Sequence, residues 1–403
     1  MHASMSRLAV VFALMSAACA GPRPGEISTT AVEADQALGA RVDAAAADAL
    51  REIPVAGFSV AVVRHGRPVL AKGYGYANLA ERVPASATTI YRLASITKEF
   101  TAAAILHLTE RGRLSLDDPI GDYLPDYPGD GRRITIRQLL SHTSGLSDAT
   151  VLPLLEESGG VGIDRNELID LVAAQPLDSE PGSQHSYSNV GYILLGLLIE
   201  HVTGTAYADY VENEILRPLE LDRTFQCPDE QRPDNGWAHG YDIQYGNWPR
   251  ALRLGRSPTF IDPPPIDMGV VSSAGALCST ATDLARWPGL LRSFLDPGSF
   301  REMYRPTVLA DGTEVPYGLG LQIRTFGSHR ALSHGGVVNG FVSLVADFPQ
   351  DELSVAMLVN TRLLNLDQGL AMANLVLRAV FDEPTSEWSD PLEAPAAGDR
   401  GSP

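Results

Sequence analysis

A central apolar run, from Phe100 to Leu108, carries hydrophobic side chains almost all the way round a helix. A surface helix keeps polar residues on its solvent face, so a helix without a polar stripe belongs in a large core. Ser95 and Lys98 stand directly before this run. One helical turn separates them if the helix begins near Ser95, which places the hydroxyl and the ammonium on one face. The pattern therefore predicts a nucleophile beside a candidate base at the mouth of a cleft.

Strand patterns occur near both ends of the chain. Residues 58–63 and 68–74 are β-branched and apolar runs joined by a four-residue turn, which predicts an antiparallel hairpin. Similar runs follow the middle of the chain and predict four more strands, at 317–326, 330–333, 340–348 and 353–360. Because strands and helices are segregated along the chain, the sheet should be mainly antiparallel. We expect the hairpin and the last strands to share it.

The middle of the chain has a different pattern. Between residues 114 and 291, apolar positions recur at helical spacing and are divided by Pro and Gly turns. The segments 32–50 and 367–381 also have helical composition. The expected fold class is α+β, with a mainly antiparallel sheet flanked by helices and an inserted all-helical region. The long stretches 151–166 and 226–268 are expected to shape the pocket.

These patterns divide the chain into consecutive parts. The Pro- and Gly-rich composition after the first twenty residues is typical of a tether, and the polar, Pro-rich end is typical of a disordered tail. The predicted parts are a signal peptide over 1–20, a linker over 21–35, an α/β region formed by 36–113 and 292–382, a helical region over 114–291, and a tail over 383–403.

Composition excludes several classes of function. The 403 residues are 44% hydrophobic and 20% charged, as in ordinary globular domains. A net charge of −18 argues against nucleic acid as a partner, because a phosphate-binding surface needs a basic patch. The nine histidines are scattered and lack the ligand spacing of a zinc hydrolase. We expect no metal and no cofactor, and a small molecule or a peptide as substrate.

Lysine usage draws attention to the central helix. Only Lys72 and Lys98 among the 31 basic residues are lysines, and the other 29 are arginines. A guanidinium cannot be deprotonated in a protein, whereas a desolvated ammonium can lose its proton and act as a base. Ser-x-x-Lys is a weak motif by itself, so its interpretation depends on partner residues elsewhere.

The first twenty residues predict export. Arg7 precedes an apolar run over 8–18 and then small residues, which is the pattern of a signal peptide. Cys19 lies where a bacterial lipoprotein is cleaved and lipidated, although Leu is more usual three residues before it. Ordinary cleavage after Ala20 is the alternative. Two cysteines remain in the mature chain, and their spacing does not decide whether they pair: Cys227 and Cys278.

Two further motifs follow the Ser-x-x-Lys pair in the chain. They are Tyr-x-Asn at 187–189 and His-Gly-Gly at 334–336. In this order the three motifs resemble those of penicillin-recognising serine hydrolases. More narrowly, the chain is similar to the family of class C β-lactamases, D-alanyl-D-alanine carboxypeptidases, D-aminopeptidases and related esterases. The segments 139–146 and 272–275 support the resemblance, which covers about residues 40 to 380.

The resemblance implies acyl transfer. Ser95 would attack a carbonyl carbon, while Lys98 and Tyr187 would take its proton and return it to the leaving group; which of the two is the base stays open. Asn189 would hold the Lys98 ammonium and a substrate amide. The oxyanion hole would be built from the backbone N–H groups of Ser95 and Val337.

The third motif departs from the lactamase pattern. His334 and Gly335 stand where most members have Lys and Thr. An imidazole with a pKa of about 6.5 is mostly neutral at pH 7.5, so the sequence predicts poor β-lactamase activity and better use of anionic substrates as the pH falls toward 6. His334, Gly335 and Gly336 are expected to line the substrate site, with the glycines letting a substrate lie close to the strand. His142 is expected to end a helix.

The expected function is that of an exported serine hydrolase that forms an acyl-enzyme on ester, amide or peptide bonds. D-Alanyl-D-alanine carboxypeptidase or class C-like β-lactamase activity is the alternative among enzymes. A non-catalytic sensor of penicillin or peptidoglycan fragments is the alternative outside enzymes, and retention of Ser95, Lys98 and Tyr187 argues against it. The acyl substrate and the oligomeric state stay open.

Overall fold

The structure is a computed structural model that describes residues 29–389 except 125–126, 128–130, 132, 149–164, 229–235, 245–258 and 364–365. The predicted signal peptide and Cys19 lie outside the described residues, and so does most of the loop over 151–166. No single helix in the described part of the chain is long and apolar enough to cross a membrane, although one bent pair of helices passes the same test together.

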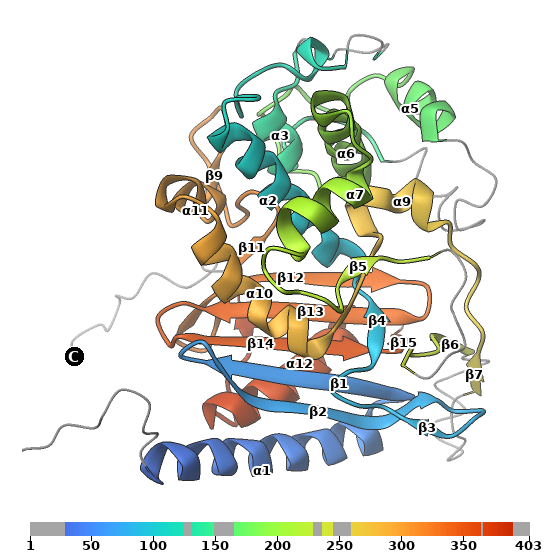
Figure 1. Cartoon of the computed structure of the whole chain (residues 1–403), viewed down its shortest axis with the longest axis vertical. Coiled ribbons are helices and arrows are strands. Elements are labelled where there is room, and N and C mark those ends of the chain that lie inside the picture. Colours follow the sequence, from blue (N-terminus) through green and yellow to red (C-terminus); the bar gives the residue numbers. More distant parts are fainter. Residues whose placement is uncertain are drawn as a thin grey trace, which may run out of the picture.

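A central antiparallel sheet of eight strands joins the two ends of the chain (Figure 1). Its order is β16-β11-β12-β13-β14-β1-β2-β3. The first hairpin pairs with the last long strand in a register that runs from Phe58 opposite Val359 to Arg64 opposite Leu353, which confirms the expected shared sheet. The strands are β1 (Gly57–Arg64), β2 (Arg67–Asn78), β3 (Val83–Pro84), β11 (Gln322–Phe326), β12 (His329–Val338), β13 (Phe341–Phe348), β14 (Leu353–Val359) and β16 (Trp388–Ser389).

Helices cover both faces of this sheet, which explains why its central strands carry apolar residues on both sides. Phe58, Val60 and Val62 of β1 point into a core shared with α1 (Thr29–Glu52) and α12 (Leu366–Phe381). Side chains of the opposite parity, among them Ala61, enter a second core shared with α2 (Thr97–Glu110) and α10 (Ala281–Phe294). Alternate residues of a strand face opposite sides, so burial on both sides requires an apolar residue at nearly every position.

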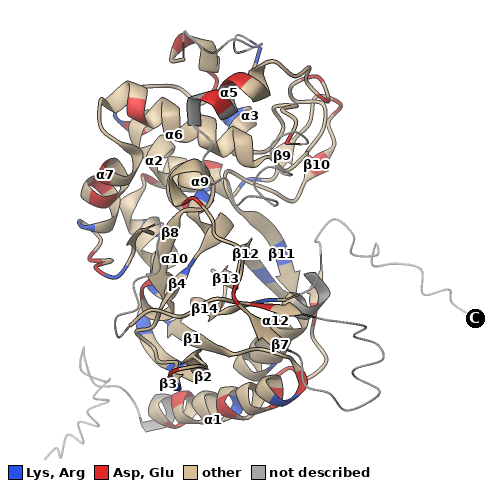
Figure 2. Ribbon diagram, turned by 90° about the vertical axis from the view of Figure 1, so that its right-hand side faces the viewer, with Lys and Arg blue, Asp and Glu red and all other residues tan. Residues whose placement is uncertain are grey.

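Helix α1 shows how a weakly hydrophobic segment is held on the sheet. Its fully buried residues, Leu38, Val42, Ala46 and Ala49, recur every three or four positions and form one face. Charged residues occupy other positions of the helix (Figure 2). Burial of that apolar face, rather than intrinsic helix propensity alone, stabilises the element.

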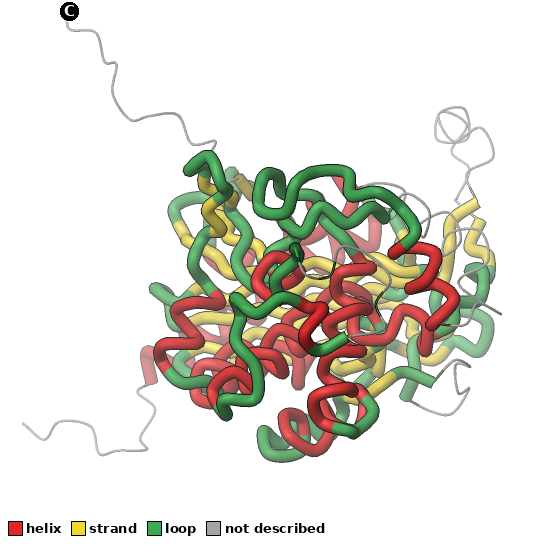
Figure 3. The backbone as a smooth tube through the Cα atoms, turned by 90° about the horizontal axis from the view of Figure 1, so that it is seen from above, coloured by secondary structure: helices red, strands yellow, loops and turns green. Residues whose placement is uncertain are grey.

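The helical region lies at one end of the sheet, where helices overlie the strands when seen from above (Figure 3). Helix α2 is its centre, and nearly all of its residues are buried, as the apolar run predicted. Around it lie α3 (Ile136–Leu140), α5 (Arg165–Ala173), α6 (Asn189–Thr203), α7 (Tyr207–Val211), a π-helical turn (Glu212–Leu216), α9 (Met268–Gly275) and α11 (Pro297–Met303).

The inserted region is not all-helical, and this corrects the sequence prediction. Short strands tie it to the rest of the molecule, because segments between its helices pair with strands from outside the insertion. β8 pairs with both β4 and β5, and β6 pairs with β7 and β15. These strands, with one separate pair, are β4 (Ile90–Arg92), β5 (Phe225–Gln226), β6 (Tyr241–Gln244), β7 (Thr259–Ile261), β8 (Leu277–Thr280), β9 (Thr307–Val308), β10 (Glu314–Val315) and β15 (Thr361–Arg362).

Two predicted boundaries also need correction. Residues 29–35, assigned to the linker, form the first turns of α1. Residues 388–389, assigned to a disordered tail, form β16 and pair with Phe326 and Thr325 of β11. Isolated two-residue strands carry little local sequence signal, because their pairing depends on a partner far along the chain.

Cys227 and Cys278 form a disulfide that links the end of β5 to β8. The pairing, which spacing alone left open, closes a loop of 51 residues. A cross-link of this size restricts the unfolded chain and contributes on the order of 3–4 kcal/mol in the loop-entropy account. The disulfide therefore anchors the stretch that connects α7 to α9.

Candidate active site

Ser95 lies in a short 3₁₀ turn (Ala94–Ile96) between β4 and α2. Ala94 has a φ of +49°, in the left-handed region that favours glycine. The turn is held in this conformation by the sheet, because the Ser343 hydroxyl of β13 donates a 2.6 Å hydrogen bond to the carbonyl of Leu93. Backbone strain of this kind is found at sites where a side chain must be aimed.

The two glycines of the third motif have different surroundings. A Cβ on Gly336 would lie 2.2 Å from the Leu93 carbonyl oxygen, so only glycine lets β12 pack against the turn that carries Ser95. A Cβ on Gly335 would meet nothing closer than the Ser343 carbonyl oxygen at 3.7 Å. Gly336 is therefore required by protein packing, while Gly335 leaves open space.

Lys98 is completely buried beneath Ser95. Its Nζ lies 3.2 Å from Ser95 Oγ, 2.9 Å from Asn189 Oδ1 and 2.7 Å from the Ala274 carbonyl oxygen. The amide and the carbonyl oxygens can only accept hydrogen bonds. When Lys98 is neutral, its two N–H groups are taken by these two acceptors, and its lone pair is left for the Ser95 hydroxyl proton.

The charge state of Lys98 follows from its burial. Desolvation lowers the pKa of Lys98 to about 7, and the negative charge of Asp148 opposes this shift. An amine that titrates near neutrality is free base in a large fraction of molecules and can accept a proton. This property separates Lys98 from an arginine at the same place.

Tyr187 lies at the rim of the site and is 38% exposed. The Lys98 Nζ atom is 4.9 Å from the centre of the Tyr187 ring. Burial of the hydroxyl end raises the pKa of Tyr187, and a hydrogen bond with Ser95 opposes the rise. The phenol is therefore protonated at neutral pH. Of the two residues left open by the sequence, Lys98 is the better base, and Tyr187 is suited to pass a proton on.

Asp148 organises the second motif, and sequence analysis missed it. Its carboxylate accepts hydrogen bonds from the Ser188 hydroxyl (2.6 Å) and from the backbone N–H groups of Asn189 (2.6 Å) and Val190 (3.3 Å). These bonds satisfy the N-terminus of α6 and orient Asn189 toward Lys98. A single acidic residue in a non-periodic stretch carries no signal in the sequence that would reveal this role.

A buried chain of hydrogen bonds connects the second and third motifs. The backbone N–H of Ser188 donates to His142 Nδ1 (3.1 Å), His142 Nε2 lies 3.0 Å from the Tyr317 hydroxyl, and that hydroxyl lies 3.1 Å from His334 Nε2. His334 Nδ1 is 2.6 Å from the carbonyl oxygen of Gly335, which can only accept. All groups are satisfied when both imidazoles are neutral and the Tyr317 hydroxyl donates to His334.

This arrangement corrects the interpretation of His334. The imidazole is 2% exposed, and burial together with the nearby Lys98 charge lowers the pKa of His334 to about 3. It therefore does not become a cation as the pH falls toward 6, contrary to the expectation from the sequence. His142 does follow the end of α3, as expected, but it also holds the backbone of the second motif.

We expect the preference between anionic and neutral substrates to be independent of pH between about 6 and 8, because His334 keeps one charge state there. The measurement is the ratio of kcat/KM for a dicarboxylic half-ester to that for a neutral ester of equal length. Taking the ratio cancels the titration of Lys98. His334→Gln cannot titrate and should show the same flat profile. A ratio that rises toward pH 6 in the wild type but not in His334→Gln would show that His334 becomes charged in this range.

One cleft of about 970 Å³ brings the predicted residues together. Lys98 is buried behind its lining and contacts Ser95 and Asn189. Part of the Pro-rich stretch over 226–268 forms a wall, as expected. Seven predicted residues line the cleft: Ser95, Tyr187, Asn189, His334, Gly335, Gly336 and Val337. Besides them, Asp242, Ile243 and Gln244 of β6 and Ile261 of β7 lie in its lining.

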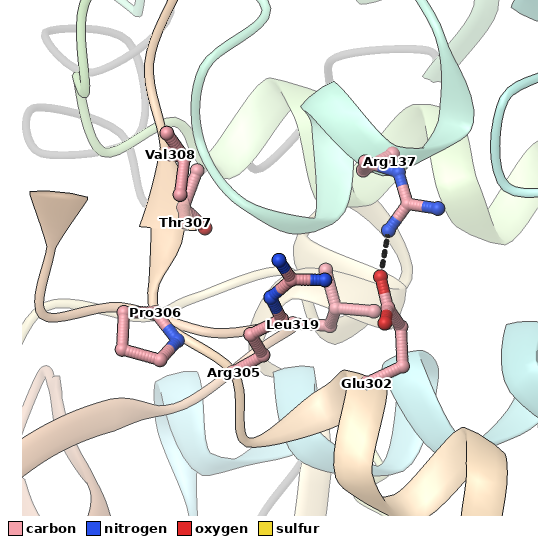
Figure 4. Close-up of a pocket in the computed structure, with 7 residues that line it drawn as sticks. All are labelled: Arg137, Glu302, Arg305, Pro306, Thr307, Val308 and Leu319. Atoms are coloured by element: carbon pink, nitrogen blue, oxygen red, sulfur yellow. Dashed lines mark hydrogen bonds and ion pairs between the residues drawn. The ribbon is translucent and has the colours of Figure 1, made fainter. Parts of the chain in front are cut away.

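A second pocket, of about 300 Å³, lies between α3 and the segment after α11 (Figure 4). An ion pair between Arg137 and Glu302 crosses it, and Arg137 also binds Asp117. None of the residues predicted to act in chemistry lines this pocket. The larger cleft is therefore the candidate active site.

Comparison with known proteins agrees with this geometry. The Beta-lactamase family profile matches residues 42–377, which is most of the chain. The chain belongs to the Beta-lactamase family. Its fold is the β-lactamase/transpeptidase-like fold, and the α+β class predicted from the sequence is confirmed. The chain is therefore related to β-lactamases, and penicillin-binding proteins are among the relatives and structural neighbours that it matches.

Several relatives of this Beta-lactamase family member are known. Protein flp of Staphylococcus aureus (strain MW2) is 30% identical over 320 residues, which cover 76% of this chain and 60% of that protein. The octameric penicillin-binding protein homologue from Pyrococcus abyssi superposes with a TM-score of 0.71 at 26% identity, over 85% of this chain and 77% of the other. A D-stereospecific amidohydrolase from Streptomyces sp. superposes with a TM-score of 0.68 at 28% identity, over 85% of this chain and 98% of the other.

Proposed function

We propose that this protein is an exported serine hydrolase that forms an acyl-enzyme on Ser95 and acts on ester, amide or peptide bonds, with neutral esters or amides as its best substrates. The observation that carries the proposal is the buried Lys98, whose pKa of about 7 and 3.2 Å contact with Ser95 Oγ suit it to take the hydroxyl proton. The family supports hydrolase chemistry.

In the first step, neutral Lys98 accepts the Ser95 proton while Oγ bonds to the carbonyl carbon and the carbonyl π electrons move onto oxygen. The backbone N–H groups of Ser95 and Val337 stabilise that oxyanion. The oxyanion electrons then re-form the carbonyl, and the bond between the carbonyl carbon and the leaving group breaks. Tyr187 gives its hydroxyl proton to the leaving group and regains one from the Lys98 ammonium, so the acyl-enzyme forms with Lys98 neutral again. Water attacks the acyl-enzyme by the same proton path in reverse.

The pH profile of the free enzyme should report Lys98. Below its pKa of about 7 the residue is an ammonium and cannot accept a proton, so we expect kcat/KM for a neutral ester to rise as the pH increases through about 7 and then to level off. Asp148→Asn removes the charge that raises the pKa of Lys98, so the midpoint should move to lower pH. Steady-state rates of wild type and variant across the pH range provide the measurement.

The matched control is Asp48→Asn on the surface of α1, where the carboxylate is paired with Arg51. That change should leave the midpoint unmoved. A midpoint that does not shift in Asp148→Asn, or that shifts equally in both variants, would contradict the assignment of the titration to Lys98.

Two observations favour neutral substrates over β-lactams. His334 is neutral where most members have a lysine, so one cation for a substrate carboxylate is missing. Gly335 replaces the Thr hydroxyl, which removes a hydrogen bond worth about 1 kcal/mol. The similarity to a D-stereospecific amidohydrolase supports amides as a substrate class. D-Alanyl-D-alanine carboxypeptidase or class C-like β-lactamase activity is the alternative, which the penicillin-binding protein homologue supports.

A substrate panel with covalent labelling tests the proposal. The panel contains p-nitrophenyl esters, D-amino-acid amides, D-Ala-D-Ala peptides and a cephalosporin, and the label is a fluorophosphonate mapped by peptide mass. The expected result is turnover of esters or amides and an adduct on the peptide that contains Ser95. Acylation by fluorescent penicillin without turnover of any substrate would instead identify a sensor.

Export is the second part of the proposal. The pattern of residues 7–20 supports a signal peptide, and the Cys227–Cys278 disulfide is typical of proteins in oxidising compartments. We propose that lipidation at Cys19 anchors the exported protein to the membrane. Fractionation after expression of the full chain in a bacterium, with labelled palmitate, should place the protein in the membrane fraction and label it. Cys19→Ser should abolish the label, whereas unlabelled protein cleaved after Ala20 would indicate plain secretion.

A further inference from the structure

The active-site cleft crosses from one face of the central sheet to the other at β12. Alternate residues of a strand face opposite sides, so His334 and Gly336 face the helical side, where Ser95 lies. Gly335 and Val337 face the side covered by α12, because they pair with Leu344 and Val342, which pack into the core beneath that helix. All four residues of β12 line the same cleft.

The crossing is open because β11 is shorter than β12 and does not begin until Gln322, opposite Ser333. Its pairing with β12 covers Gln322–Phe326 opposite His329–Ser333, so residues 334–338 of β12 extend beyond the start of β11. Gly335 has no side chain at this edge, and a Cβ there would meet nothing closer than 3.7 Å. A narrow substituent can therefore pass over the strand at Gly335.

Beyond the crossing, the cleft has an apolar chamber. Its walls come from the α12 face of β13 and β14, from the residue after β15 and from α12 itself. The lining residues of this part are Val342, Leu344, Met357, Leu363, Gly369 and Ala373. Polar residues, among them Asp242, Gln244 and Arg362, line other parts of the same cleft, so these six residues form an apolar patch within it. Such a patch favours an apolar part of a ligand.

The rim of the cleft is apolar as well. Tyr187, Ile261 and Val337 are 38%, 39% and 57% exposed and are three of the seven large apolar side chains that the described surface exposes. Single exposed apolar residues are ordinary on a surface, but three in one cleft mark a binding site.

The arginines of the lining are already engaged. Arg362 contacts Asp242 at 2.6 Å and Asn339 at 3.0 Å, and the guanidinium of Arg324 lies 5.0 Å from the centre of the Trp388 ring. An anionic substrate would have to compete with these contacts. The chamber therefore suits a neutral chain better than a charged one.

We propose that this chamber binds an unbranched apolar chain of an ester substrate, which passes over β12 at Gly335 while the carbonyl carbon stays at Ser95. The inference rests on the proposed function, since it names the substrate class of that site. Each buried methylene contributes about 0.8 kcal/mol, so kcat/KM should rise about fourfold per added methylene until the chamber is full.

The test compares p-nitrophenyl acetate, butyrate and octanoate. We expect kcat/KM for octanoate to exceed that for acetate by at least about thirtyfold in the wild type. Gly335→Leu places a side chain in the crossing, and Gly369→Leu fills the chamber from α12; each should lower the octanoate-to-acetate ratio by at least about tenfold. Both sites accept a Cβ without close contact and without a positive φ, so the fold should persist.

Gly289→Leu is the matched control, because Gly289 is an exposed helical glycine and a Cβ added there would meet nothing within 4 Å. It should keep the wild-type ratio. Octyl acetate shows which portion of the ester occupies the chamber. A preference for octyl acetate over ethyl acetate places the alcohol portion there, whereas a preference for octanoate over acetate places the acyl portion there.

Two results would overturn the inference. One is equal kcat/KM for acetate and octanoate together with equal kcat/KM for ethyl and octyl acetate, in a protein that is acylated on Ser95. The other is a preference for a half-ester with a terminal carboxylate over a neutral ester of the same length, which would assign the chamber to an anion. A protein that turns over no ester and takes no label on Ser95 would refute the proposed function itself, which is a separate outcome.

Discussion

Ser95→Ala should lower kcat for the best ester substrate by at least about a thousandfold while leaving the fold intact. Among the described residues, Ser95 supplies the hydroxyl that contacts the proposed base, with Oγ 3.2 Å from Lys98 Nζ. The alanine fits the 3₁₀ turn without new contacts, so the melting temperature should stay close to that of the wild type. Steady-state kinetics and thermal unfolding provide the two measurements.

Ser293→Ala is the control for this substitution, since Ser293 is an exposed serine of α10. It should retain full activity. An acyl adduct found by intact mass on the Ser95→Ala protein would show that another residue is the nucleophile.

Lys98→Arg should be nearly as damaging as Lys98→Ala, with a loss in kcat/KM of at least about a hundredfold. The guanidinium keeps the positive charge but cannot be deprotonated, whereas the proposed step needs a neutral base beside Ser95. The larger group must also fit a fully buried site whose three contacts are made by one nitrogen. Kinetics of the two variants at a pH above 7 provide the measurement.

Lys72→Arg offers a matched control within the same chain. Lys72 is the other lysine, lies on β2 and forms a half-exposed ion pair with Asp43. Its replacement should not change kcat/KM. If Lys98→Arg kept more than about a tenth of the activity, Lys98 would act as an electrostatic anchor and the base would have to be sought elsewhere.

The fold could be predicted where local patterns are strong. The apolar run after Lys98 predicted a buried helix, and α2 is buried along nearly its whole length. The β-branched runs at both ends of the chain predicted the hairpin and the last strands, and these share one sheet. The prediction was wrong for β5 to β8, whose pairing depends on contacts with distant segments.

The candidate site could be predicted in part. Ser95, Lys98 and Asn189 meet at hydrogen-bond distance, and Tyr187 lies beside them. Asp148 escaped notice, because its contacts with the start of α6 join residues about forty positions apart. No periodicity or spacing records such a contact.

The sequence by itself determined which residues are available for acyl transfer, because Ser95 and Lys98 are one turn apart on a helix whose burial follows from its own apolar pattern. Only the tertiary structure decided their chemical states. His334 and Lys98 are ordinary titrating residues in an unfolded chain, yet desolvation lowers the pKa of Lys98 to about 7 and that of His334 to about 3. The same holds for Gly335 and Gly336, which are adjacent and identical in the sequence. The pleat of β12 turns Gly336 against Leu93 and Gly335 toward the chamber under α12, because neighbouring residues of a strand face opposite sides of the sheet.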